Sequence, residues 1–327
     1  MAQFVAGLGC SHSPMISLEP ALWTVRGQED RRHQLLAADG KFYTYDELIP
    51  RTPKSVLEQI RPEVIQERYD ACQRGVAMIG ERLRAAEADV LIVVGDDHLE
   101  LFKDDGIPTF AIFTGDKAWC IPPPEGSMTA TNEAARATNF GNEVEEHPCV
   151  PGFGNHLAAW LTDEGFDVFR FARQYEGRPI GHAFTFMYRR VMKPAGVQYM
   201  QPITFNTYFP PNQMSPARCY EWGRAIRRAI EAWDSDLKVA LTSSGGLSHF
   251  VVDEELDQLC LRLMKDKDLA GIAELPRERL NSGNSEVRNW FAVAGACEDR
   301  DMELLDYIPC YRSEAGTGCA MAFAHWH

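Results

Sequence analysis

Apolar residues recur at helical spacing over residues 62–86, the longest periodic segment of the chain. This spacing places one apolar stripe along a helix and leaves the other positions polar, as in an amphipathic helix that packs on a core. The positions of the stripe are Val64, Ile65, Tyr69, Cys72, Val76, Ile79 and Leu83. We therefore predict one long surface helix here.

Short, continuous apolar runs alternate with such helical patterns. Residues 90–94 and 239–242 are rich in aliphatic and β-branched side chains and end at glycine or serine, which is typical of buried central strands. Further strands are expected at 4–8, 110–113, 166–171, 197–205, 303–311 and 318–325, and further helices at 156–161, 182–192, 216–233, 253–267 and 285–297. The alternation predicts an α/β fold, in which one central mixed sheet is covered by helices on both faces.

A polar, turn-rich segment at about 15–60 interrupts this alternation. We expect it to form an insertion over the surface, either as a lid or as a contact between subunits. No Gly/Ser linker and no internal repeat divides the sequence, so residues 1–327 are predicted to form a single domain.

The charge balance excludes some classes of partner. The chain has 33 Lys and Arg residues against 47 Asp and Glu residues, a formal net charge of −14, and no basic run interrupts the acidic excess. Such a protein repels phosphate backbones, so we expect no nucleic-acid partner. An anionic substrate would need a local basic pocket.

Cysteine usage and hydropathy bear on the compartment. The nine cysteines are odd in number and include no CxxC pair, which indicates free thiols in a reducing environment. No apolar run approaches the roughly 18 residues of a membrane span, and the first ten residues do not resemble a secretion signal. We expect a cytoplasmic protein without membrane contact.

Three histidines lie just beyond predicted strands: His12, His98 and His249. Ligands and reacting groups collect at the ends of strands in α/β sheets, and imidazole is a common ligand of first-row metals. The residues themselves therefore indicate a metal site with two histidines, one further histidine and a carboxylate. Spacing does not choose this carboxylate, for which the candidates are Asp96, Asp97, Glu221 and Glu286.

Seven strings in order along the chain resemble one family, the class III extradiol ring-cleavage dioxygenases of the LigB superfamily. The strings are GLGCSHSPM, VVGDDHLELF, GHAFTFMYRRV, SPARCYEWGRAIRRAIEAW, SSGGLSHF, SEVRNWFAVAGA and AGTGCAMAF. The family includes the catalytic subunit of protocatechuate 4,5-dioxygenase and the gallate and 3-O-methylgallate dioxygenases. The resemblance extends from the first predicted strand to the last.

The resemblance implies roles for particular residues. His12, His98 and Glu286 match the family's ligands of Fe(II), a facial triad that leaves coordination positions open. His249 matches the catalytic acid/base, and His182 matches a second catalytic histidine beside substrate and oxygen. The implied reaction opens the ring of a catecholic aromatic acid with O2. The candidate substrates are gallate, 3-O-methylgallate, protocatechuate and a larger biphenyl catechol.

The chain also departs from the family's two-subunit members. No segment resembles their small subunit, so the 15–60 insertion is expected to cover the site instead, and the resemblance favours a homodimer. Arg312, Ser313 and Thr317 are weaker candidates for binding the substrate carboxylate. Two alternatives stay open: a zinc-dependent hydrolase that uses the same ligands, and a non-catalytic binding protein of the same fold.

Overall fold

The long helix forms as predicted. In the computed structural model, which describes residues 1–327, α5 runs from Pro62 to Ala85 and begins with proline, whose fixed φ suits a first helical position. Its buried face includes Ile65, Cys72 and Val76, three residues of the predicted stripe. This face packs on strands of the central sheet.

The central sheet has nine strands and is mixed, as predicted. Four neighbours, β1, β10, β4 and β9, run parallel, whereas β13 joins β1 and β5 joins β9 in antiparallel pairs. The strands are β1 (Gln3–Cys10), β4 (Val90–Asp96), β5 (Phe110–Phe113), β8 (Phe169–Phe171), β9 (Tyr199–Phe205), β10 (Lys238–Ser244), β11 (His249–Val251), β12 (Met302–Tyr311) and β13 (Thr317–Trp326).

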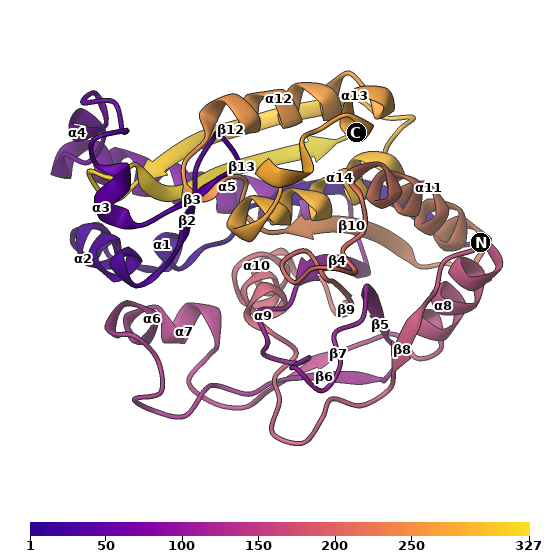
Figure 1. Cartoon of the computed structure of the whole chain (residues 1–327). Coiled ribbons are helices and arrows are strands. Elements are labelled where there is room, and N and C mark those ends of the chain that lie inside the picture. The colour runs from indigo at the N-terminus through magenta and orange to yellow at the C-terminus, as the bar shows by residue number, and fades with distance from the viewer.

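Helices cover both faces of this sheet, and two hydrophobic clusters of 49 and 37 buried residues lie between the layers. One face carries α5, α9 (His182–Met187) and α10 (Lys193–Ala195), and a π-helical turn at Tyr188–Met192 joins α9 to α10. The other helices are α8 (Phe153–Asp163), α11 (Pro216–Ala232), α12 (Glu254–Lys265), α13 (Leu269–Ala273) and α14 (Val287–Ala296). Figure 1 shows this layered arrangement.

The 15–60 segment is more ordered than its polar composition indicates. It folds into α1 (Pro14–Ser17), α2 (Trp23–Glu29), a small hairpin of β2 (Leu35–Leu36) and β3 (Phe42–Tyr43), α3 (Tyr45–Leu48) and α4 (Val56–Gln59). Trp23 is fully buried, and its indole N–H donates to the carbonyl of Met15 at 3.0 Å. The indigo α1 and α2 lie beside α6 (Ala130–Ala134) and α7 (Arg136–Asn139) in Figure 1.

Some elements are not apparent from the sequence pattern. A separate two-stranded sheet pairs β6 (Lys117–Cys120) with β7 (Glu145–Pro148), and His249 itself begins the short β11. The strand expected at 166–171 is limited to Phe169–Phe171. β6 and β7 mix polar and apolar residues and β11 has only three residues, so none of them forms a continuous apolar run like that of the four-residue β5.

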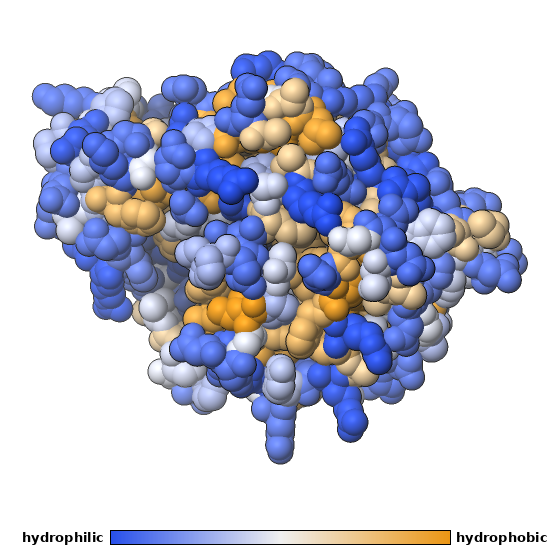
Figure 2. All heavy atoms as spheres, turned by 45° about the vertical axis from the view of Figure 1, so that its right-hand side comes forward, coloured by the Kyte–Doolittle hydropathy of each residue, from blue (hydrophilic) through white to orange (hydrophobic).

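The surface is largely polar on the face drawn in Figure 2, where hydrophobic side chains form small, separate groups. Scattered exposed apolar residues are normal for a folded domain. None of the helices combines the length and the hydrophobicity that crossing a bilayer requires.

Candidate metal and catalytic site

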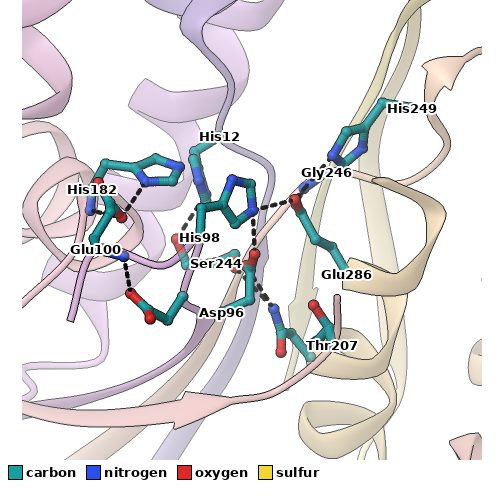
Figure 3. A network of polar contacts seen from close by, with 12 residues as sticks. His12, Asp96, His98, Glu100, His182, Thr207, Ser244, Gly246, His249 and Glu286 are labelled. Atoms are coloured by element: carbon teal, nitrogen blue, oxygen red, sulfur yellow. Dashed lines mark hydrogen bonds and ion pairs between the residues drawn. The ribbon is translucent and has the colours of Figure 1, made fainter. Parts of the chain in front are cut away.

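The ends of three adjacent parallel strands bring the predicted histidines together. Cys10, the last residue of β1, is in register with Ser244, the last residue of β10, and β10 pairs with β4 on its other side. His12 and His98 each lie two residues beyond their strands, so they flank the loop that follows β10. Figure 3 shows both rings facing the same space.

Glu286 enters this space from a distant part of the sequence. It ends a short 3₁₀ turn (Ser282–Glu286) before α14 and is 3% exposed. Its Oε1 lies 3.4 Å from Nε2 of His98 and 2.9 Å from Nε2 of His249, while its Oε2 accepts the backbone N–H of Gly246 at 2.8 Å. Of the four candidate carboxylates, Glu286 is thus placed between two of the predicted histidines.

Asp96 is a second buried carboxylate at the same place. Its Oδ2 lies 2.6 Å from Nε2 of His98 without the geometry of a hydrogen bond. Potential ligand atoms of Asp96, His98 and Glu286 all lie within 4.8 Å of one another. Asp97, in contrast, accepts the backbone N–H groups of residues 100–102, so its carboxylate stabilises the loop. Glu221 lies on α11 and is exposed.

Hydrogen bonds indicate the tautomer of His12. The hydroxyl of Ser244 donates its only proton to the carbonyl of Ala183 at 2.9 Å, and its oxygen lies 3.0 Å from Nδ1 of His12. Nδ1 must therefore carry the proton, which leaves the lone pair of Nε2 for a metal ion. Burial, reinforced by the neighbouring His182, lowers the pKa of His12 to about 3, so the ring is neutral.

His249 has the opposite protonation. Its Nδ1 lies 2.9 Å from the carbonyl of Leu247 and its Nε2 lies 2.9 Å from Glu286, and both of these partners are acceptors. Burial disfavours the charged ring, but Glu286 outweighs it and raises the pKa of His249 well above its ordinary value. Without a metal ion, His249 is therefore an imidazolium paired with Glu286.

His98 is held in the same charged state. Burial opposes its protonation, but Asp96 and then Glu286 raise its pKa well above the usual range. Nε2 of His98 therefore lies between two carboxylates. Such a donor set, with buried carboxylates and imidazoles, suits a divalent cation that replaces the proton.

His182 begins α9 and completes the cluster. Its Nδ1 lies 2.7 Å from Oε2 of Glu100, and its ring centroid is 5.0 Å from those of His12 and His98. Burial opposes protonation of His182, but Glu100 outweighs this effect and raises the pKa of His182. Burial also opposes ionisation of Glu100, but His182 outweighs it and lowers the pKa of Glu100 to about 2. The carboxylate thus orients the ring and leaves Nε2 toward the cluster.

The histidines and Glu286 line one cavity of about 250 Å³. The ring of Tyr208 lies beside His98 in a tilted arrangement, with centroids 4.5 Å apart and an interplanar angle of 58°. Its buried hydroxyl has no hydrogen-bond partner. The remaining lining includes Phe140, Phe250, Cys319, Arg26 and Arg312. The cavity is therefore lined by side chains that can bind a metal ion, by aromatic rings and by two arginines.

The weaker substrate candidates are placed differently from one another. Arg312 lines the cavity, but it is 3% exposed and pairs with Asp30 through two contacts of 2.8 Å. Ser313 and Thr317 bond to each other at 2.6 Å and do not line the cavity. Sequence reasoning left Arg26, Glu100, Ser244 and Tyr208 without a role; no signal in the sequence marked them, because their contacts form only in the folded chain.

The chain is similar to known proteins over most of its length. Residues 53–318 match the family model described as the catalytic LigB subunit of aromatic ring-opening dioxygenase, and this range includes His98, His182, His249 and Glu286. A gallate dioxygenase of Pseudomonas putida is 57% identical over 37 residues. That segment covers 11% of this chain and 11% of the relative.

Proposed function

Because the chain belongs to the LigB family of aromatic ring-opening dioxygenases, we propose that it is an Fe(II)-dependent extradiol dioxygenase. Its substrate is a catecholic aromatic acid, and both atoms of O2 enter the ring-opened product. The observation that carries this proposal is the convergence of His12, His98 and Glu286 on one cavity, with His249 on the same carboxylate.

His12, His98 and Glu286 would hold the ion, with Asp96 beside His98. When bound, a divalent iron supplies positive charge that favours ionised catechol oxygens and leaves positions open for the diol and for oxygen. Ser244 keeps the proton of His12 on Nδ1, and Nε2 of His98 would lose the proton that Asp96 and Glu286 stabilise. The protein thereby presents two imidazole nitrogens and one carboxylate.

His249 is the acid/base group of this proposal. Its Nδ1 is committed to the carbonyl of Leu247, so only Nε2 exchanges protons with the cavity. Once Glu286 is engaged elsewhere, the pKa of His249 loses its main raising influence, and Nε2 becomes able to accept a proton from a catechol hydroxyl. The same nitrogen then returns the proton to an oxygen atom later in the reaction.

His182 would act beside the substrate as a fixed donor. Glu100 holds both its ring and its backbone N–H, at 2.7 and 3.1 Å. A ring oriented in this way donates to an oxygen atom without reorganisation, which favours charge that develops during the reaction.

The size of the cavity favours a single-ring substrate. Its volume of about 250 Å³ lies below the ~300–1,000 Å³ of pockets that hold drug-sized ligands. Gallate, protocatechuate and 3-O-methylgallate suit such a volume better than a biphenyl catechol does.

Oxygen consumption tests the proposal. Protein loaded anaerobically with Fe(II), and matched protein loaded with Zn(II), should be mixed with each of these acids in an oxygen electrode. Uptake with one molar equivalent of O2 per substrate in the iron form alone is expected. Turnover of any of these acids by the zinc form without oxygen would support the hydrolase alternative, and no uptake with any acid would overturn the proposal.

A further inference from the structure

One basic side chain of the cavity has no carboxylate hydrogen-bonded to it. We infer that Arg26, carried by α2 of the insertion, binds the carboxylate of the aromatic acid and so selects acidic over neutral catechols. This inference rests on the proposed function. It names a specificity-determining residue outside the residues matched by the family model.

The side chain of Arg26 is fixed in position by neutral groups. Its Nη1 donates to Oγ1 of Thr131 at 2.9 Å and to Oδ1 of Asn132 at 2.8 Å. Its Nε is buried and has no hydrogen-bond partner. The side chain as a whole is only 15% exposed. A buried guanidinium with an unused donor is an unfavourable arrangement that a bound carboxylate would relieve.

The acidic neighbours do not neutralise Arg26. Glu29 approaches it only at 3.9 Å and accepts instead from the hydroxyl of Thr131 at 2.6 Å. Burial, and next the charge of Arg312, lower the pKa of Arg26 to about 10, which shows that its surroundings disfavour the charge. Arg312 differs because Asp30 accepts from it through both carboxylate oxygens. Of the two arginines that line the cavity, Arg26 is therefore the one that still has a hydrogen-bond donor and a positive charge available for a bound anion.

The cavity thus offers two kinds of recognition to one small molecule. Carboxylates and imidazoles suit a cation that holds the diol, and the guanidinium of Arg26 suits an anion. Neither Arg26 nor Arg312 forms an ion pair with Asp96, Glu100 or Glu286, so the two sets of charges are not already joined to each other. A catechol that carries a ring carboxylate satisfies both, whereas a neutral catechol satisfies only the first.

The test compares gallate with pyrogallol, which has the same three hydroxyls and no carboxylate. Arg26→Gln removes the charge and keeps a polar side chain. Asn132→Asp leaves Arg26 in place but puts a carboxylate at the position 2.8 Å from its Nη1. Arg32→Gln, at an exposed position just beyond α2, is the matched control for net charge. Anaerobic calorimetry measures the Kd of each compound, and oxygen uptake measures kcat and KM.

Arg26→Gln and Asn132→Asp should each weaken gallate binding by about 10- to 100-fold and leave pyrogallol binding within about twofold. Arg32→Gln should change neither. Equal changes for both compounds, or no change for gallate, would overturn the assignment of Arg26. Absence of turnover by the unmodified protein with both compounds would instead overturn the proposed function, and the binding data would still decide the role of Arg26.

Discussion

Nε2 of His249 lies 2.9 Å from Oε1 of Glu286, so the proposed acid/base and a proposed metal ligand share one hydrogen bond. The two residues come from different elements, the start of β11 and the turn before α14. The contact couples them electrostatically: a cation on Glu286 weakens the attraction that holds the proton on His249. Metal loading and proton transfer are thereby linked through one carboxylate.

Replacing His249 by alanine should separate these two roles. We expect His249→Ala to bind iron and to lose about 10²- to 10⁴-fold in kcat, because proton transfer loses its positioned base. Iron content by elemental analysis and oxygen uptake measure the two effects. His156→Gln is the control, since Nε2 of His156 bonds to the carbonyl of Ala229 outside the cavity. An unchanged kcat in His249→Ala would show that another group is the base.

The two buried carboxylates should differ in their effect on metal affinity. Glu286→Ala is expected to abolish iron binding, whereas Asp96→Asn should weaken it by about 10- to 100-fold, as for a partner that supports a ligand. Glu221→Gln, on the exposed face of α11, should have no effect. Equilibrium dialysis with Fe(II) gives each affinity. Complete loss of iron in Asp96→Asn would make Asp96 a ligand itself.

Stability should depend on pH through His147, which does not line the cavity. Its ring is fully buried against Tyr188 with 4.0 Å between centroids, and neither nitrogen has a hydrogen-bond partner. Burial, with a smaller contribution from Arg189, lowers its pKa to about 3. As pH falls below the ordinary value near 6.5, the unfolded chain binds a proton that the folded chain does not, so stability is lost.

Denaturant unfolding between pH 4.5 and 7.5 measures this loss. The free energy of unfolding should fall by up to about 1.4 kcal/mol per pH unit through His147. His147→Phe keeps the aromatic contact and should remove that part of the slope, while His33→Phe at an exposed position should not. Parallel pH profiles of the wild type and His147→Phe would contradict this account.

Gly283 gives a way to disturb His249 without replacing a proposed ligand. A Cβ at this position would lie 1.9 Å from the carbonyl oxygen of His249 and 2.4 Å from its Cδ2. Gly283→Ala must therefore displace either β11 or the 3₁₀ turn that carries Gly283 and Glu286, and we expect a loss of about 1–3 kcal/mol in stability and about 10- to 100-fold in kcat. Gly106→Ala, which has no atom within 4 Å of its added Cβ, is the control. Normal kcat in Gly283→Ala would mean that the position of His249 is not critical.

Much of the fold follows from the sequence pattern, because its longest elements are strongly periodic or continuously apolar. The helix at 62–86 and the strand at 90–94 appear as α5 and β4, within two residues of their predicted limits. The pair β6–β7 has no continuous apolar run and the strand β11 has only three residues, so they are not recognised in this way. The polar, turn-rich composition of the insertion did not predict its helices, whose formation accompanies the burial of Trp23 and Tyr45.

The proximity of His12 and His98 was predictable, because each of them follows the end of a strand. The proposal of Glu286 as the carboxylate needed the family resemblance, because no local spacing connects residue 286 to residue 98. Arg26 and Ser244 act through partners that are distant in the chain, such as Asn132 and His12. Pairwise contacts of this kind depend on tertiary packing and leave no periodic signal in the sequence.

The ion pair between Arg312 and Asp30 bears on how a substrate enters. It joins the turn between β12 and β13 to the turn after α2, and both side chains are at most 4% exposed. Swinging the insertion outward would separate two buried charges, which typically costs about 3–5 kcal/mol. We therefore expect slow amide hydrogen exchange in α2, and a pocket whose roof stays in place while catechols diffuse in and out beneath it.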